Sequence, residues 1–226
     1  MDHAMTSEAE ASRTAGDIRD YLLRQLNSAL RRPGMFGAEI ALRLYFDAIA
    51  FTDRGERAWA EDRSALQSRE AFVSTGVTGA VERALGHRAE DVMASVYAEI
   101  AHQHAWLTLD SNLPEADYER MRNRLPAWCA QDRSHSEVVA EFGEPSMLIG
   151  GSNPRYPKTL AYATAHTGSP LIFFHLWNGT QPGAGANWPP EHPEPVLLAA
   201  RYSGARFIDG FIFTPTGSAR RAELAS

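Results

Sequence analysis

The chain has 226 residues, of which 44% are hydrophobic and 22% charged, and its formal net charge is −6. This composition is ordinary for a globular protein, and the acidic balance argues against nucleic-acid binding. No apolar run is long enough to span a membrane and a single cysteine, Cys129, excludes an internal disulfide, so we expect a cytoplasmic protein.

The first 14 residues are small and polar and predict a disordered N-terminus, in which either Met1 or Met5 fits as the native start. Apolar side chains then recur about every four residues, which predicts an all-helical segment over 15–130. A helix apolar almost all round, at about 38–51, is expected at the centre of the bundle. The other helices are expected at about 14–32, 56–74, 77–85, 89–107 and 114–125, the last of them capped by Asn112 and ended by Pro126.

The segment Arg32-Pro33-Gly34-Met35-Phe36-Gly37 joins the first two predicted helices. It resembles the Arg-Pro-Gly-Met-Tyr segment of type II topoisomerase ATPase subunits, a family in which the next helix supplies Glu, Asn and Asp to Mg-ATP and an Asp-x-Gly-x-Gly lid follows. The helix after this segment has no asparagine and no such lid follows, which excludes that ATPase. We expect a tight turn with Met35 and Phe36 in the core. The segment is also similar to one near the start of uncharacterised bacterial proteins, a resemblance that implies no activity.

After Ser134 the apolar period changes from four residues to two, following a capping box, Ser134–Glu137, and a short helix at 138–142. The fold class predicted is therefore α+β, an N-terminal helical segment packed on a C-terminal helix plus a four- or five-stranded antiparallel sheet over 134–214, with a tail at 215–226. Strands are expected at 146–149, 159–165, 171–177, 196–202 and 206–213.

Two of these strands are apolar on both faces, so both faces of the sheet need cover. The helix at 138–142 accounts for one face. The N-terminal helices are our preferred cover for the other, and a partner protein is the alternative.

Residues 138–145 and 159–162 resemble the helix-plus-sheet repeat of the β-lactamase-inhibitor and outer-membrane-assembly lipoprotein type, in which a helix ends in a Phe/Leu-Gly-x-Pro turn before an antiparallel sheet. The chain departs from that family in lacking a lipoprotein signal and paired helices. The resemblance implies protein binding rather than catalysis.

A Pro/Gly-rich segment at 178–195 is the candidate partner-binding loop, since structureless loops of this length in compact domains are either functional or disordered. Trp188 is a rigid aromatic of the kind that anchors interfaces, and Glu191, His192 and Glu194 form a polar, mainly acidic rim. The structural alternative is a tryptophan folded back onto the sheet.

Two polar residues within predicted strands, His175 and Asp209, are the candidate acid–base pair of an enzyme, with a structural ion pair as the alternative for such strand residues. His102-Gln103-His104 lies in a predicted helix, where positions i and i+2 point apart and cannot share a metal ion. Gly183-Ala184-Gly185 is not followed by the Lys-Ser/Thr of a phosphate loop. We therefore expect no metal and no cofactor.

These patterns favour a small cytosolic protein-binding module, of the kind that neutralises a toxin or regulates an enzyme, over an enzyme. An enzyme with a His175/Asp209 pair between helices and sheet is the alternative. A homo-oligomeric scaffold whose uncovered sheet face pairs with itself is a third hypothesis.

Overall fold

The computed structural model describes the backbone of residues 2–185 and 188–224 and the side chains of 14–181 and 189–223. The helices are α1 (Asp2–Arg31), α2 (Ala38–Thr52), α3 (Glu56–Ser68), α4 (Gly76–Leu85), α5 (Glu90–Gln103), α6 (Glu115–Trp128), α7 (His135–Phe142) and α8 (Pro215–Leu224), with 3-10 turns η1 (Pro33–Met35) and η2 (Ile208–Gly210). The strands are β1 (Met147–Gly150), β2 (Lys158–Tyr162), β3 (Ile172–Trp177), β4 (Thr180–Gly185), β5 (Trp188–Pro190), β6 (Val196–Arg201) and β7 (Phe211–Phe213).

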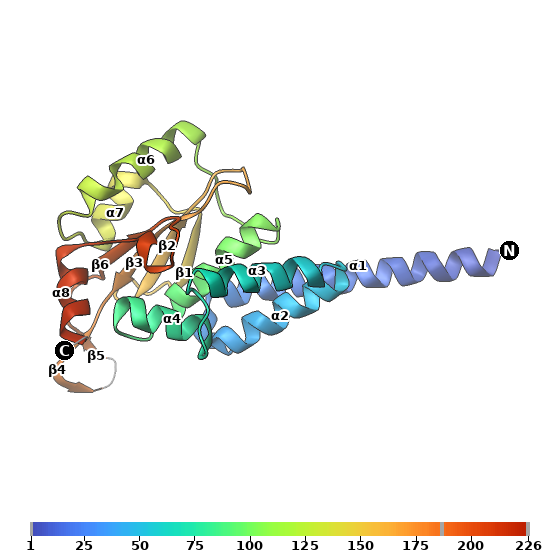
Figure 1. Cartoon of the computed structure of the whole chain (residues 1–226), viewed down its shortest axis with the longest axis horizontal. Coiled ribbons are helices and arrows are strands. Elements are labelled where there is room, and N and C mark those ends of the chain that lie inside the picture. The colour runs from blue at the N-terminus through green and yellow to red at the C-terminus, as the bar shows by residue number, and fades with distance from the viewer. Residues whose placement is uncertain (1, 186–187, 225–226) are drawn as a thin grey trace.

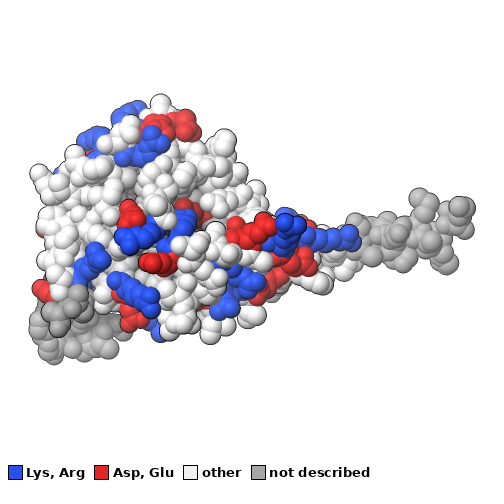
Figure 2. Space-filling view, in the orientation of Figure 1, with Lys and Arg blue, Asp and Glu red and all other residues white. Residues whose placement is uncertain are grey.

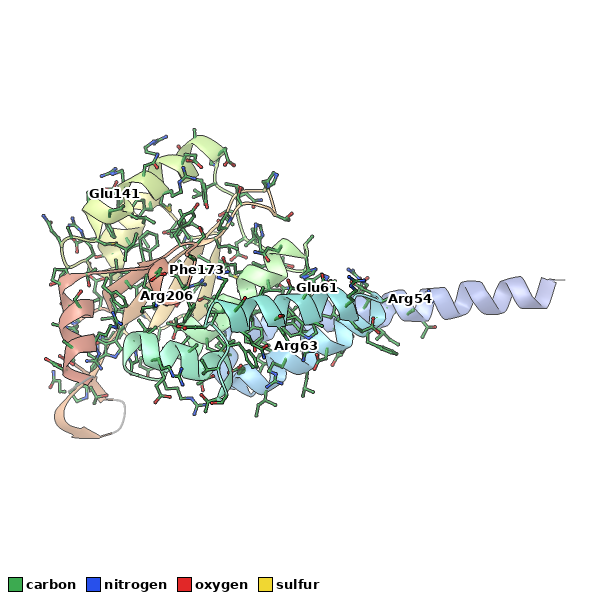
Figure 3. All side chains as sticks on the ribbon, viewed as in Figure 1. Arg54, Glu61, Arg63, Glu141, Phe173 and Arg206 are labelled. Carbon is green, nitrogen blue, oxygen red and sulfur yellow. The ribbon has the colours of Figure 1, made fainter. Side chains whose placement is uncertain are left out.

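Five strands form one antiparallel sheet in the order β1-β2-β3-β6-β7. Adjacent residues on a strand point to opposite faces, and here both faces are apolar. Phe173 packs in a core with residues of α1–α5, whereas Phe174 packs in a second core with α6 and α7. Figure 1 shows these two groups of helices on opposite sides of the sheet, and in Figure 3 Phe173 lies between the sheet and the helices beneath it. The predicted α+β class and the cover of both sheet faces by the chain's own helices are confirmed.

The capping box at α7 is confirmed: the Ser134 hydroxyl accepts from the Glu137 amide, and the Glu137 carboxylate accepts from the Ser134 amide.

In the described part of the chain, no helix is both long and apolar enough to cross a membrane.

Several predicted helix boundaries differ from the structure, and α3 and α5 end at Ser68 and Gln103 rather than near 74 and 107. α1 begins at Asp2 rather than near Thr14, because the alanine- and glutamate-rich start favours a helix. α6 continues past Pro126 to Trp128, whose indole packs edge-on against Phe142 and Phe174 and so holds the last turn. The residue preceding α6 is Pro114 rather than the predicted cap Asn112.

The C-terminal third also differs in detail. The segment 178–195 is not structureless, since β4 and β5 pair as a two-stranded ribbon that stands apart from the main sheet (Figure 1). The Asn178 side chain closes its base by bonding the backbone of Arg155 and His192. The strand predicted at 206–213 is shortened to β7 by the turn η2, and the predicted tail holds helix α8.

Candidate active site

A cavity of about 580 Å³ opens between the turn η1, the start of α5, the β1–β2 hairpin and strand β3. Its inner wall is mostly apolar and includes Val92, Leu176 and Leu198. Its lining also includes polar residues, among them Asp91 from the first turn of α5 and His175 from β3. An apolar cavity with a few convergent polar groups is the usual form of a small-molecule site.

Thr159 connects these two polar side chains. In the β2–β3 register Thr159 lies directly opposite His175, and side chains opposite each other on one sheet face meet. The Thr159 hydroxyl lies 2.9 Å from His175 Nδ1 and donates to Asp91 Oδ2 across 2.7 Å. Thr159 and His175 are almost completely buried. Asp91 and His175 line the cavity, so the two ends of this relay touch it while its middle does not.

The protonation of the relay follows from its surroundings. Burial, with a smaller contribution from the Arg201 charge, holds the pKa of His175 well below its usual value, so the imidazole is neutral at pH 7. Burial also raises the pKa of Asp91 to about 6, although hydrogen bonds from Thr159 and from backbone amides oppose the shift. At pH 7 most Asp91 is therefore ionised and accepts from Thr159.

The direction of these bonds assigns the tautomer of His175. Because the Thr159 hydroxyl gives its hydrogen to Asp91, its oxygen accepts from Nδ1–H of His175. The other ring nitrogen, Nε2, then carries a lone pair. It is buried and has no hydrogen-bond partner among the described residues. Nε2 is thus an unused, buried acceptor on a residue that lines the cavity.

The strand that carries His175 is irregular at this point. The pairing of β3 with β6 shifts register between His175 and Leu176, so that Leu198 has no direct partner across the strand pair. Such bulges re-aim side chains and are frequent beside active sites. Leu198 and Leu176 both line the cavity, so the shift shapes its floor.

The mouth of the cavity carries both charge and exposed apolar surface. Arg32, Arg88 and Glu90 supply the charges. Met35 on η1 and Tyr156 on the β1–β2 hairpin are exposed apolar side chains on the lining. The predicted tight turn at Arg32–Gly37 is therefore present, but Met35 lies at the cavity and not in the core, whereas Phe36 packs partly against the core.

The structure does not bring His175 and Asp209 together at the relay. Asp209 lies in the turn η2, where its exposed carboxylate accepts from Arg206. Arg206 lowers the pKa of Asp209, as a surface ion pair does. His175 reaches its carboxylate, Asp91, through Thr159 instead.

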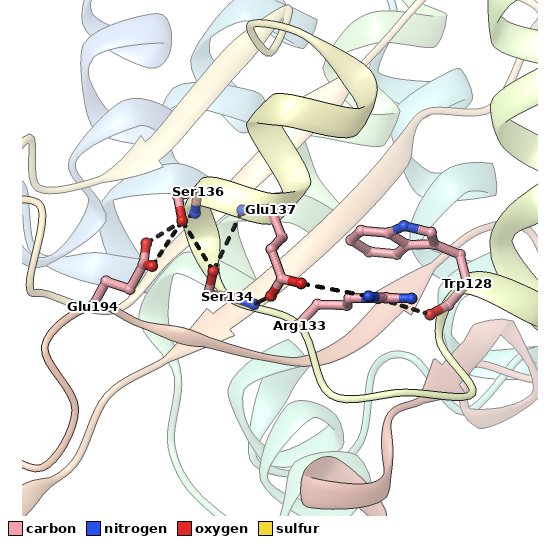
Figure 4. A network of polar contacts seen from close by, with 6 residues as sticks. All are labelled: Trp128, Arg133, Ser134, Ser136, Glu137 and Glu194. Carbon is pink, nitrogen blue, oxygen red and sulfur yellow. Dashed lines mark hydrogen bonds and ion pairs between the residues drawn. The ribbon is translucent and has the colours of Figure 1, made fainter.

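The candidate binding residues of the 178–195 segment have separate environments. The side chain of Trp188 lies outside the described residues. Glu194 accepts from the Ser136 amide at 2.9 Å and from its hydroxyl at 2.7 Å, at the start of α7 (Figure 4). Glu191 is exposed beside His192, whose ring packs edge-on against Trp177. Glu194 thus has a structural role. Glu191 is the carboxylate of this set whose side chain is exposed to solvent, where a partner can reach it.

The two histidines of His102-Gln103-His104 lie in separate environments. His102 is buried, and His104 contacts Asp62 at 2.6 Å while stacking on Trp106. Among the described side chains, no group of three or more His, Cys, Asp or Glu is placed to share a metal ion.

No family model matches this chain, and no curated protein or solved structure matches it.

Proposed function

We propose that the protein binds a small, largely apolar molecule in the cavity between η1, α5, the β1–β2 hairpin and β3. It exchanges a proton with that molecule through the Asp91–Thr159–His175 relay. The observation that carries this proposal is the unpartnered Nε2 of His175, a buried lone pair on a residue that lines a cavity with a mostly apolar inner wall. Leaving a buried polar atom unsatisfied costs about 1–3 kcal/mol, and a ligand O–H or N–H removes that cost.

The relay gives a way to accept a proton without creating a buried cation. A ligand donor transfers its proton to Nε2, Nδ1 passes its own proton to the Thr159 oxygen, and the Thr159 hydroxyl proton moves to Asp91. The imidazole ends neutral, which matters because Arg201 already disfavours a charged ring. The charge change falls on Asp91, whose pKa of about 6 suits a general base acting near neutral pH.

Fragment binding tests the cavity. Saturation-transfer NMR with a library of small phenols, alcohols and amines should identify binders of the wild-type protein. Gly151→Trp should abolish that binding, since Gly151 lines the cavity and a Cβ there meets its nearest atoms only at 4.0 Å. Gly16→Trp, on α1 with nothing within 4 Å, is the matched control. Fragments that bind both variants equally would place the site elsewhere.

Calorimetry then tests proton exchange. A fragment that binds should be titrated at pH 6 in two buffers of different ionisation enthalpy, since the difference gives the protons taken up or released. Wild-type protein should release a fraction of a proton to the buffer, because about half of Asp91 is protonated at pH 6 and must ionise before it can accept the ligand's proton. Asp91→Asn should release none while still binding. Equal proton release by the two proteins would remove Asp91 from the mechanism.

Protein binding through the 178–195 segment is a second proposal, and the position of the β4–β5 ribbon outside the main sheet favours it (Figure 1). Glu191 is the residue to test, because Glu194 supports α7. Glu191→Ala should weaken a complex with a basic partner without lowering stability. A co-purifying protein whose affinity is unchanged by Glu191→Ala would argue against this surface.

A further inference from the structure

Exposed apolar side chains concentrate on the first two helices. Seven large hydrophobic residues are exposed in the part of the chain whose side chains are described, and five of them lie on α1 and α2. These five define the α1–α2 face: Ile18, Tyr21, Ile40, Leu44 and Phe51.

The α2 members of this face share one side of the helix. Ile40, Leu44 and Phe51 are spaced by four and seven residues, which places them in one row. The opposite side of α2 is buried through Leu42, Phe46 and Ile49. The prediction that α2 lies at the centre of the bundle is therefore wrong, since Ile40 and Phe51 are 73% and 74% exposed.

We propose that the α1–α2 face joins two copies of this chain about a twofold axis, with α2 packed antiparallel to α2 of the second copy. A helix at the surface of a monomer normally presents polar residues outward, and one that is apolar all round is buried. The α2 row presents apolar residues outward, so it fits this rule only when another surface covers it.

The exposed area suits such an interface. The five side chains together expose on the order of 600 Å², at the upper end of the largest apolar patches on monomers, which run to roughly 300–600 Å². A stable interface takes roughly 800 Å² from each partner. The apolar face therefore provides most of one side of an interface before any flanking polar residue is counted.

Charge favours a second copy over a partner of one sign. Arg43 and Asp47 border the α2 row, and Figure 2 shows both signs intermingled over this part of the molecule. A face bordered by both signs can complement itself, as a twofold interface requires. In the antiparallel arrangement Ile40 lies opposite Phe51 of the second copy and Leu44 lies opposite its Asp47, so Arg43 comes one residue away from that carboxylate.

The molar mass in solution tests the proposal. Light scattering on the full chain at tens of micromolar should give twice the chain mass of 24.9 kDa. Leu44→Glu should weaken association by about 30-fold or more, the size of a hot-spot loss, with an unchanged circular dichroism spectrum. Tyr156→Glu, an exposed apolar residue on the β1–β2 hairpin, should leave the doubled mass unchanged. A wild-type mass of one chain at all concentrations would overturn the proposal, as would a dimer that survives Leu44→Glu.

Cross-linking tests the arrangement. The native Cys129 is buried, so an introduced cysteine is the reactive one. A short bismaleimide should link Leu44→Cys to itself and should link Ile40→Cys to Phe51→Cys in a mixture, but not Asn123→Cys, which lies on α6. A parallel pairing would instead link Ile40→Cys to itself and would overturn the antiparallel arrangement.

Discussion

Arg201 on β6 donates a hydrogen bond to the Glu99 carboxylate on α5 across 2.8 Å, and both side chains are buried. The same guanidinium lies 4.4 Å from the centre of the Phe173 ring and bonds the Ser95 hydroxyl. The pair thus joins the helical layer to the middle of the sheet. Arg201 is thus a charged strand residue whose role is a structural ion pair, the alternative that we gave for polar residues within strands.

Arg201→Met should destabilise the protein by about 3–5 kcal/mol, because it leaves the Glu99 charge buried without its partner. Urea unfolding at pH 7 measures this loss. The double variant Arg201→Met/Glu99→Leu should recover much of it, since both buried charges are then removed. A double variant as unstable as the sum of the single variants would mean that the two residues act independently.

Asp91→Asn should stabilise the protein at alkaline pH while impairing proton exchange. The pKa of Asp91 is raised to about 6, so the folded state binds this proton more tightly than the unfolded chain. Its contribution to stability is full below about pH 4 and is lost as pH rises through 6. The asparagine variant does not lose this contribution. At pH 8 it should therefore be more stable than the wild type by on the order of 3 kcal/mol at most.

Urea unfolding of both proteins at pH 4 and pH 8 measures the effect of Asp91→Asn. Asp209→Asn is a control of opposite sign, because Arg206 lowers the pKa of Asp209 and the exposed pair stabilises slightly at pH 8. A wild-type protein that matches Asp91→Asn in stability at both pH values would contradict the raised pKa.

Glu39→Ala should cost about 3 kcal/mol or more of folding free energy. The Glu39 carboxylate accepts from the backbone amides of Val77 and Thr78, at 2.7 and 2.8 Å, and so caps α4 from another helix. It also accepts from the buried Tyr97 hydroxyl at 3.0 Å. Removing it leaves these donors unsatisfied, each at a cost of about 1–3 kcal/mol.

Thermal unfolding followed by circular dichroism measures the effect of Glu39→Ala. Gly76→Ala tests the same contact from the other side, because its Cβ would collide with Glu39 Oε1 and Gly76 has φ +81°. Glu39→Gln should be milder than Glu39→Ala, since its amide keeps one acceptor. Equal losses for the two Glu39 variants would mean that the one acceptor oxygen kept by glutamine contributes little.

Cys129 should resist thiol reagents in the folded protein. It is buried, and burial raises the pKa of its thiol to about 11. At pH 8 the thiolate is then roughly a hundredfold scarcer than in a free cysteine, so labelling should slow by at least about that factor. Labelling by a chromogenic disulfide in buffer and in 8 M urea measures the difference. Fast labelling in buffer would indicate that the region around α6 opens.

Local patterns were sufficient to predict the class of fold. The doubly apolar residues of β3 predicted a sheet covered on both faces, and Phe173 and Phe174 pack into separate cores as expected. The Ser134–Glu137 capping box was recognisable because its partners lie three residues apart. The ordered base of the 178–195 segment was not predictable, since Asn178 is held by Arg155 of a different loop.

The candidate site was only half predictable for the same reason. His175 stood out as a polar residue in an apolar strand. Asp91 is 68 residues from Thr159 and reads as an ordinary acidic residue in the first turn of a helix. Thr159 reads as an ordinary strand residue. Only the β2–β3 register and the position of α5 above it bring the three together.

The interleaving of helices and sheet has a consequence for how the chain is synthesised. Helices α1–α5 emerge from the ribosome before any strand, yet the apolar surface that they turn toward the sheet is covered by β1–β3, β6 and β7. Contacts between such distant segments form slowly, and uncovered apolar surface promotes aggregation in the meantime. We therefore expect the nascent protein to depend on chaperones until Phe213 has left the exit tunnel, and truncations before β6 should accumulate as insoluble material.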